Sequence, residues 1–99
     1  MAILLLVAAP GTTASADTIR IEIRELSFRS TVVSAHVGDT IEWVNDDFVA
    51  HTATARTGAW DIELVPHATG SIELTKPGKV EYYCRFHPNM KGEIAIAPQ

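Results

Sequence analysis

The stretch that indicates the fold most clearly is Val37-Gly38-Asp39-Thr40-Ile41-Glu42-Trp43-Val44-Asn45. Residues 37–39 are typical of a turn, and the six residues after them alternate in polarity, with Ile41 and Trp43 on one face and Glu42 on the other. Such a period of two is typical of a strand with one face in the core. We therefore expect a strand at 40–45 with Ile41 and Trp43 buried.

The same pattern continues on both sides of this stretch. Residues 19–24 alternate Ile with Arg or Glu, and further short strands are expected at 31–35, 51–55, 62–64, 71–74, 80–84 and 93–97. Residues 56–70 are expected to form a long loop that contains the short strand at 62–64, and Lys76-Pro77-Gly78-Lys79 is a strong turn signal. Helical periodicity is absent. Seven to eight short strands predict an all-β fold, a Greek-key antiparallel β-sandwich, with Phe28 covering one end.

Length and charge restrict the classes of function. The chain has 99 residues, with twelve Asp and Glu against eight Lys and Arg, giving a formal net charge of −4. This length suits one domain, and the acidic balance argues against nucleic acid as a partner, because phosphate binding needs clustered positive charge. Cys84 is the only cysteine, so no intrachain disulfide can form. A bound metal would help to stabilise a domain this small.

The first sixteen residues differ in composition from the rest. Residues 3–9 are purely apolar and are followed by small residues that end in Ala14-Ser15-Ala16. This pattern resembles a secretory signal peptide, residues 1–16, cleaved before Asp17. The apolar run is too short for a bilayer, which takes about 20 residues. No Lys or Arg precedes the run, which indicates either a start upstream of Met1 or an atypical signal. An uncleaved tether is the alternative to a cleaved signal peptide. We expect residues 17–99 to form an exported, periplasmic domain with no membrane span.

The chemistry is concentrated in Tyr83-Cys84-Arg85-Phe86-His87-Pro88-Asn89-Met90. It carries a thiol, an imidazole and a thioether at the spacing Cys-x-x-His-x-x-Met, and one short loop between two strands can direct all three to a common point. A second imidazole, His51, begins a predicted strand. Two imidazoles, a thiolate and a weak thioether suit copper in both oxidation states. The pattern predicts one copper ion, cycling between Cu(I) and Cu(II), on His51, Cys84, His87 and Met90.

Other readings of these residues remain open. Cys84 as an inert buried thiol, Met90 as a core side chain and His51 as an incidental histidine are the alternatives. Zinc also binds Cys and His, although Met is a poor zinc ligand. We expect His36 and His67 to be exposed, and Trp60 to pack on one end of the sandwich.

The sequence resembles the cupredoxins, the small blue copper proteins with a type 1 site, over nearly all of residues 17–99. The resemblance lies in residues 37–45, His51-Thr52, residues 76–84 and the ligand loop. The short loop, with Pro88 directly after His87, is most similar to that of the amicyanins; pseudoazurins and plastocyanins have longer His-to-Met spacings. The resemblance implies a Greek-key sandwich with copper near one end, held by the four residues named above.

Two positions depart from the family pattern. Thr52 stands where an Asn commonly braces the ligand loop, and a hydroxyl would have to make that bond differently. Phe86 stands where many relatives have Pro, which changes the apolar rim around the metal. We expect Thr52 to support the ligands, and Phe86 and Pro88 to belong to a docking rim around His87.

The function implied is outer-sphere transfer of single electrons, without catalysis. A redox protein donor and acceptor would dock transiently around His87, and we expect a monomer. Arg85 and Lys91 lie beside this port and would either attract a partner's carboxylates or simply be solvated. A copper carrier using the same ligands is one rival. An enzyme is the other, and it would need an open coordination position or a second metal cluster that His36 and His67 alone cannot build.

Overall fold

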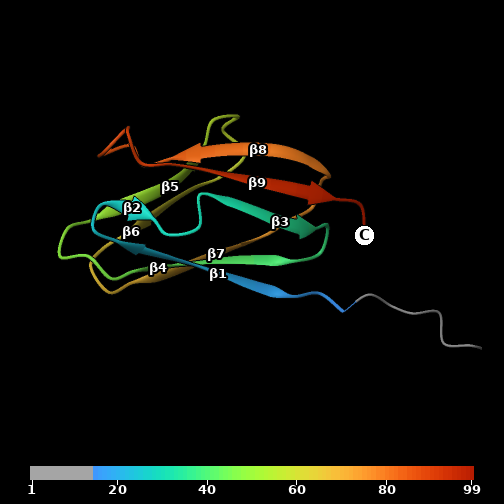
Figure 1. The fold of residues 1–99 in the computed structure, drawn as a ribbon, viewed down its shortest axis with the longest axis horizontal. Coiled ribbons are helices and arrows are strands. Elements are labelled where there is room, and N and C mark those ends of the chain that lie inside the picture. Colours follow the sequence, from blue (N-terminus) through green and yellow to red (C-terminus); the bar gives the residue numbers. More distant parts are fainter. Residues whose placement is uncertain (1–14) are drawn as a thin grey trace, which may run out of the picture.

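The computed structural model describes residues 15–99 (Figure 1). The predicted signal peptide, residues 1–16, therefore lies outside the described residues except for its last two. The described chain contains no helix and, consequently, none long and apolar enough to cross a membrane. It forms nine strands: β1 (Thr18–Arg24), β2 (Ser27–Phe28), β3 (Val32–His36), β4 (Thr40–Asn45), β5 (His51–Ala55), β6 (Asp61–Leu64), β7 (Thr69–Glu73), β8 (Gly78–Tyr83) and β9 (Lys91–Ala97).

The strands form two layers that pack face to face (Figure 1). One sheet has the order β2-β1-β4-β7 and the other the order β3-β9-β8-β5-β6. The predicted all-β sandwich is thus confirmed. The sheets are mixed rather than antiparallel throughout, because β1 runs parallel to β4 and β3 runs parallel to β9. Alternation along a strand records which of its faces is buried, but it carries no information about the direction of the neighbouring strand.

Strand limits differ from the expected ones in the second half of the chain. The predicted strand at 71–74 begins earlier, at Thr69, and so includes Gly70. A Cβ on this glycine would lie 2.7 Å from Ile62 Cγ2, so the strand contains a glycine because β6 approaches it closely. From the sequence alone, the glycine had indicated that residue 70 belongs to a loop. The two-residue β2 was not expected, since so short a strand has no periodicity.

The core lies between the sheets and is rich in aromatic rings. Ile41 and Trp43 are fully buried, as predicted. Trp43 contacts Tyr82 edge-on, with ring centroids 5.4 Å apart, and Trp60 packs against both rings. Phe28 is only 1% exposed and lies 4.7 Å from the Tyr82 ring, so it belongs to the core rather than covering an end. β2 places it there by pairing with β1.

One buried carboxylate fastens the end of the sandwich where the C-terminus lies (Figure 1). Asp39, in the turn between β3 and β4, accepts the backbone amides of Asp17 and His36 at 2.9 and 2.8 Å. These two bonds lower the pKa of Asp39 below its ordinary value, although burial opposes them. An ionised side chain therefore fastens this turn to the residue that precedes β1 and to the end of β3.

Candidate metal centre

The loop between β8 and β9, residues 84–90, is closed by its own backbone. The Cys84 amide donates to the Met90 carbonyl at 3.1 Å, which continues the hairpin ladder beyond Tyr83 and Lys91. The Met90 amide donates to the His87 carbonyl at 2.8 Å and closes a four-residue turn. Pro88 occupies the second position of this turn, where its fixed φ is favourable. The local sequence therefore presets the spacing of the three candidate ligands on this loop.

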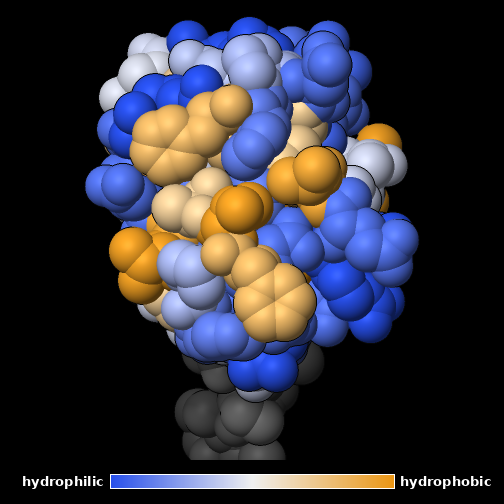
Figure 2. All heavy atoms as spheres, turned by 90° about the vertical axis from the view of Figure 1, so that its left-hand side faces the viewer, coloured by the Kyte–Doolittle hydropathy of each residue, from blue (hydrophilic) through white to orange (hydrophobic). Residues whose placement is uncertain are grey.

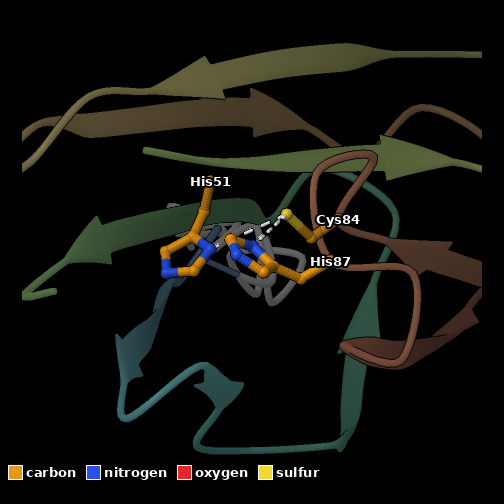
Figure 3. Close-up of side chains that lie close together, drawn as sticks. All are labelled: His51, Cys84 and His87. Carbon is orange, nitrogen blue, oxygen red and sulfur yellow. Dashed lines mark hydrogen bonds between the residues drawn. The ribbon is translucent and has the colours of Figure 1, made fainter. Parts of the chain in front are cut away.

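His51, at the start of β5, meets this loop across the sheet. The Cys84 Sγ lies 3.7 Å from the Nδ1 of His51 and 3.7 Å from the Nδ1 of His87 (Figure 3). All three donor atoms lie within 4.8 Å of one another. His51 and Cys84 are fully buried and His87 is partly exposed. Three side chains separated by up to 36 residues thus converge on one point.

The spacing of these atoms suits a shared ion. Around an ion with a metal–sulfur bond of about 2.3 Å and metal–nitrogen bonds of about 2.0 Å, sulfur and nitrogen lie about 3.7 Å apart at a 120° angle. Both measured sulfur-to-nitrogen distances are 3.7 Å. A His₂Cys trigonal set with a weak axial thioether is the arrangement preferred by copper in electron-transfer sites. The positions of the thiol and the two imidazoles therefore suit a shared ion such as copper.

Met90 ends the loop and is 4% exposed. Its carbonyl accepts the Cys84 amide at 3.1 Å, so residue 90 lies beside Cys84 at the base of the ligand loop, and its side chain belongs to the buried core. This position keeps Met90 as the candidate for a fourth ligand.

A carboxylate that the sequence analysis missed holds His51. The His51 Nε2 lies 2.7 Å from the Asp47 Oδ2, and Asp47 also accepts the amides of Glu25 and Leu26 at 2.7 and 2.9 Å. Burial opposes ionisation, but the bonds from Leu26, His51 and Glu25 outweigh it and lower the pKa of Asp47. The charged acceptor makes Nε2 the protonated nitrogen, which leaves the Nδ1 lone pair facing Cys84.

Asp47 reaches His51 because of a tight turn between β1 and β2. Glu25 and Leu26 both have left-handed φ angles, 55° and 57°, as a type I′ hairpin turn requires, although neither is Gly or Asn. The two amides exposed by this turn point at the Asp47 carboxylate. Nothing in the spacing of residues 25, 26 and 47 signals this contact.

Thr52 connects β5 to the ligand loop through both its backbone and its side chain. Its amide donates to the Cys84 Sγ at 3.3 Å, and its Oγ1 accepts the Arg85 amide at 2.8 Å. Thr52 therefore contacts the candidate thiolate and the next residue of the loop together. This is the hydroxyl bond across to the loop that the sequence analysis required.

Apolar side chains gather on the surface at this end of the sandwich (Figure 2). We call them the apolar rim; its members are exposed by 45% to 90% and are Leu26, Phe48, Val49, Val65 and Phe86. Pro88 is also exposed. Single apolar residues are ordinary on a protein surface, but several of them lie in the loops at the same end of the sandwich as the candidate ligands.

The remaining candidates lie away from the centre or are engaged elsewhere. His36 and His67 are exposed, as expected. Trp60 packs against Trp43, with ring centroids 5.1 Å apart. Arg85 bonds to Asp61, with Nε and Oδ1 3.1 Å apart, so its charge is partly satisfied within the chain.

Comparisons with known proteins show the family to which the chain belongs. The family described as "Cupredoxin-like domain" matches residues 1–96. Amicyanin-alpha of Methylorubrum extorquens is 27% identical over 89 residues, which cover 84% of this chain and 75% of that protein. Amicyanin of Paracoccus versutus is 24% identical over 87 residues, covering 82% and 66%. The chain thus spans about two thirds to three quarters of these relatives.

Solved structures of amicyanin variants have the same fold. A Cu(I) form of a variant with Met replaced by Ala has a TM-score of 0.71 at 21% identity, covering 80% of this chain and 81% of that one. An oxidised variant with Met replaced by Leu has a TM-score of 0.72 at 21% identity, covering 79% and 80%. Because the family match spans nearly all of the sequence, this chain belongs to the cupredoxin-like family, and it is most similar to the amicyanins.

Proposed function

We propose that the protein is a blue copper protein that carries single electrons between redox partners, with copper held by His51, Cys84, His87 and Met90. The observation that carries the proposal is the pair of 3.7 Å distances from the Cys84 Sγ to the two imidazole Nδ1 atoms. When bound, copper would supply a one-electron couple whose potential depends on the axial donor and on the hydrogen bonds around the Cys sulfur.

The chain contributes rigidity. His51 is held by the Asp47 carboxylate, and Cys84 receives the Thr52 amide, so the two buried donors are oriented before any ion arrives. Strands β5 and β8 belong to one sheet and limit movement between the two donors. Donors that keep their positions in both oxidation states lower the reorganisation required when an electron moves.

Electrons would enter and leave at His87, the one partly exposed member of the cluster. The apolar rim would allow a partner to dock briefly, as small redox encounters require. Arg85 is paired with Asp61, so Lys91 rather than Arg85 would supply the positive charge that attracts a partner. We expect a monomer that meets a protein donor and a protein acceptor in turn, without nucleic acid and without catalysing a reaction of its own.

The N-terminal pattern supports export. Residues 1–16 have the apolar run and the small residues of a secretory signal, which would deliver residues 17–99 to the periplasm. Mass spectrometry of the protein recovered from a periplasmic fraction tests this. A mature chain that begins at Asp17 is expected, and an intact residue 1 would contradict it.

The decisive experiment is the visible spectrum after addition of Cu(II). The wild type is expected to develop an intense thiolate-to-copper absorption band, and Cys84→Ser is expected to lose it. His36→Ala is the matched control, because His36 is an exposed imidazole at the other end of the sandwich. A Cys84→Ser variant that keeps the band would refute the ligand assignment. Rapid copper release with slow electron self-exchange would favour a copper carrier.

A further inference from the structure

Four residues of β5, β6 and the ligand loop form a closed ring of hydrogen bonds that the copper chemistry does not itself require. Thr52 Oγ1 accepts the Arg85 amide at 2.8 Å and lies 2.9 Å from Thr54 Oγ1. Thr54 Oγ1 bonds to Asp61 Oδ1 at 2.6 Å, and Arg85 Nε donates to the same oxygen at 3.1 Å. Arg85 thus enters the ring twice, once by its backbone and once by its guanidinium.

The hydroxyl protons of Thr52 and Thr54 can be arranged in only one way. Ionised Asp61 can only accept, so Thr54 must donate its proton to Asp61. The Thr54 oxygen is then free to accept, and Thr52 donates to it. Thr52 in turn accepts the Arg85 amide. Chains of bonds that all run in one direction strengthen one another, and this one ends on a charge.

Burial distinguishes this ring from an ordinary surface ion pair. The side chains of Arg85 and Asp61 are 39% and 52% exposed, and a pair this exposed contributes little by itself. Thr52 is fully buried and Thr54 is 8% exposed, so their hydroxyls depend on protein partners. The register of β5 and β6 sets Thr54 directly opposite Asp61. The carboxylate is therefore the last acceptor for two buried groups.

The ring reaches the candidate thiolate through one residue. The Thr52 amide donates to the Cys84 Sγ at 3.3 Å, while the Thr52 hydroxyl holds the amide of Arg85, the next residue along. A shift of Thr52 therefore moves both contacts. Because the hydrogen bonds at the Cys sulfur tune a copper site, an effect on Thr52 becomes an effect on the metal.

We propose that Asp61 is a positioning residue, which fixes the ligand loop and the Cys84 sulfur through Thr54 and Thr52. Arg85 serves the same ring through its backbone amide and its guanidinium. The inference deepens the proposed function and, in its effect on the metal, rests on it. Its structural part concerns only the chain and can be tested without copper.

The first measurement is amide hydrogen exchange by NMR in the metal-free protein. Asp61→Ala is expected to speed exchange of the Arg85 amide about fivefold, the size expected from the loss of one hydrogen bond. Glu63→Ala is the matched control: Glu63 is an exposed carboxylate on the same strand, close enough to interact electrostatically with Arg85, but outside the ring. Equal exchange in the two variants would overturn the proposal.

A second pair of variants separates the ring from general destabilisation. Thr54→Val keeps the shape of the side chain but removes the hydroxyl, so it is expected to reproduce the effect of Asp61→Ala. The double variant is expected to exchange no faster than either single one, because both break the same chain. Asp61→Asn keeps an acceptor oxygen and is expected to recover part of the protection. Additive effects, or no recovery, would count against the ring.

The copper-loaded protein supplies the functional measurement. Asp61→Ala is expected to shift the thiolate-to-copper band and the reduction potential, whereas Glu63→Ala leaves both near the wild-type values. If the band appears and neither Asp61→Ala nor Thr54→Val alters it or the exchange, the ring is refuted and the copper proposal stands. If exchange responds as expected but the wild type never develops the band, the copper proposal fails and the positioning role toward the loop remains.

Discussion

Replacing Asp47 with Ala tests whether one carboxylate orders both the His51 ligand and the turn between β1 and β2. The change removes three hydrogen bonds, from the amides of Glu25 and Leu26 and from the His51 ring. The amide bonds lie at an exposed turn and contribute about 1 kcal/mol each, and the bond to the fully buried imidazole contributes about 2 kcal/mol. Together these losses predict a destabilisation of about 4 kcal/mol.

Urea unfolding of the metal-free protein measures this loss, and Asp46→Ala is the matched control. Asp46 is an exposed neighbouring carboxylate, so its replacement is expected to change the free energy of unfolding by no more than about 0.5 kcal/mol. A second effect concerns the metal: Asp47→Ala is expected to weaken copper binding about 10- to 100-fold, because an outer partner orients a ligand histidine. Equal stability and equal copper affinity in the two variants would refute the reasoning.

Three further predictions concern packing, pH and the axial donor. Gly92→Ala is expected to destabilise the fold by about 3 kcal/mol in thermal or urea unfolding, because a Cβ would overlap the buried Tyr82 ring; wild-type stability would show that the ring moves freely. The pKa of Asp39 is lowered from 3.8 by the amides of Asp17 and His36, so its stabilising contribution is present above that pH and is lost as the pH falls through the lower folded value. The free energy of unfolding of the metal-free protein, measured between pH 6 and pH 2, should therefore fall less with falling pH for Asp39→Asn than for the wild type. An identical pH dependence in the two proteins would contradict this. Met90→Gln is expected to keep copper but lower the reduction potential, because a harder donor favours Cu(II); an unchanged or raised potential in voltammetry would count against Met90 as axial donor.

Much of the strand pattern is local and could be predicted from sequence. The alternation in residues 19–24 and 40–45 records which side chains face the core, and both segments are strands with that face buried. The alternation does not encode strand neighbours, so the parallel pairing of these two strands was not foreseen. The burial of Phe28 was missed for a similar reason. It depends on the pairing of β2 with β1, and a two-residue strand is too short to show an alternating pattern.

The candidate site also has a part that the sequence predicted and a part that it did not. Cys84, His87 and Met90 share one seven-residue loop, so their spacing alone indicated that they meet. Asp47 and Asp61 were not foreseen, although Asp47 bonds directly to the candidate ligand His51, and Asp61 is linked to Cys84 through Thr54 and Thr52. Acidic residues are common in loops and at strand edges, and neither position has a distinguishing neighbour in the sequence.

By itself, the sequence determined the class of fold, the residues that face the core and the kind of donors available to a metal, because these follow from local periodicity and from side-chain chemistry. The tertiary structure alone decided which donors lie 3.7 Å apart and which carboxylates hold them in place. The physical reason is that a hydrogen bond between distant segments depends on strand register and loop closure. These are properties of the whole sandwich rather than of any one segment.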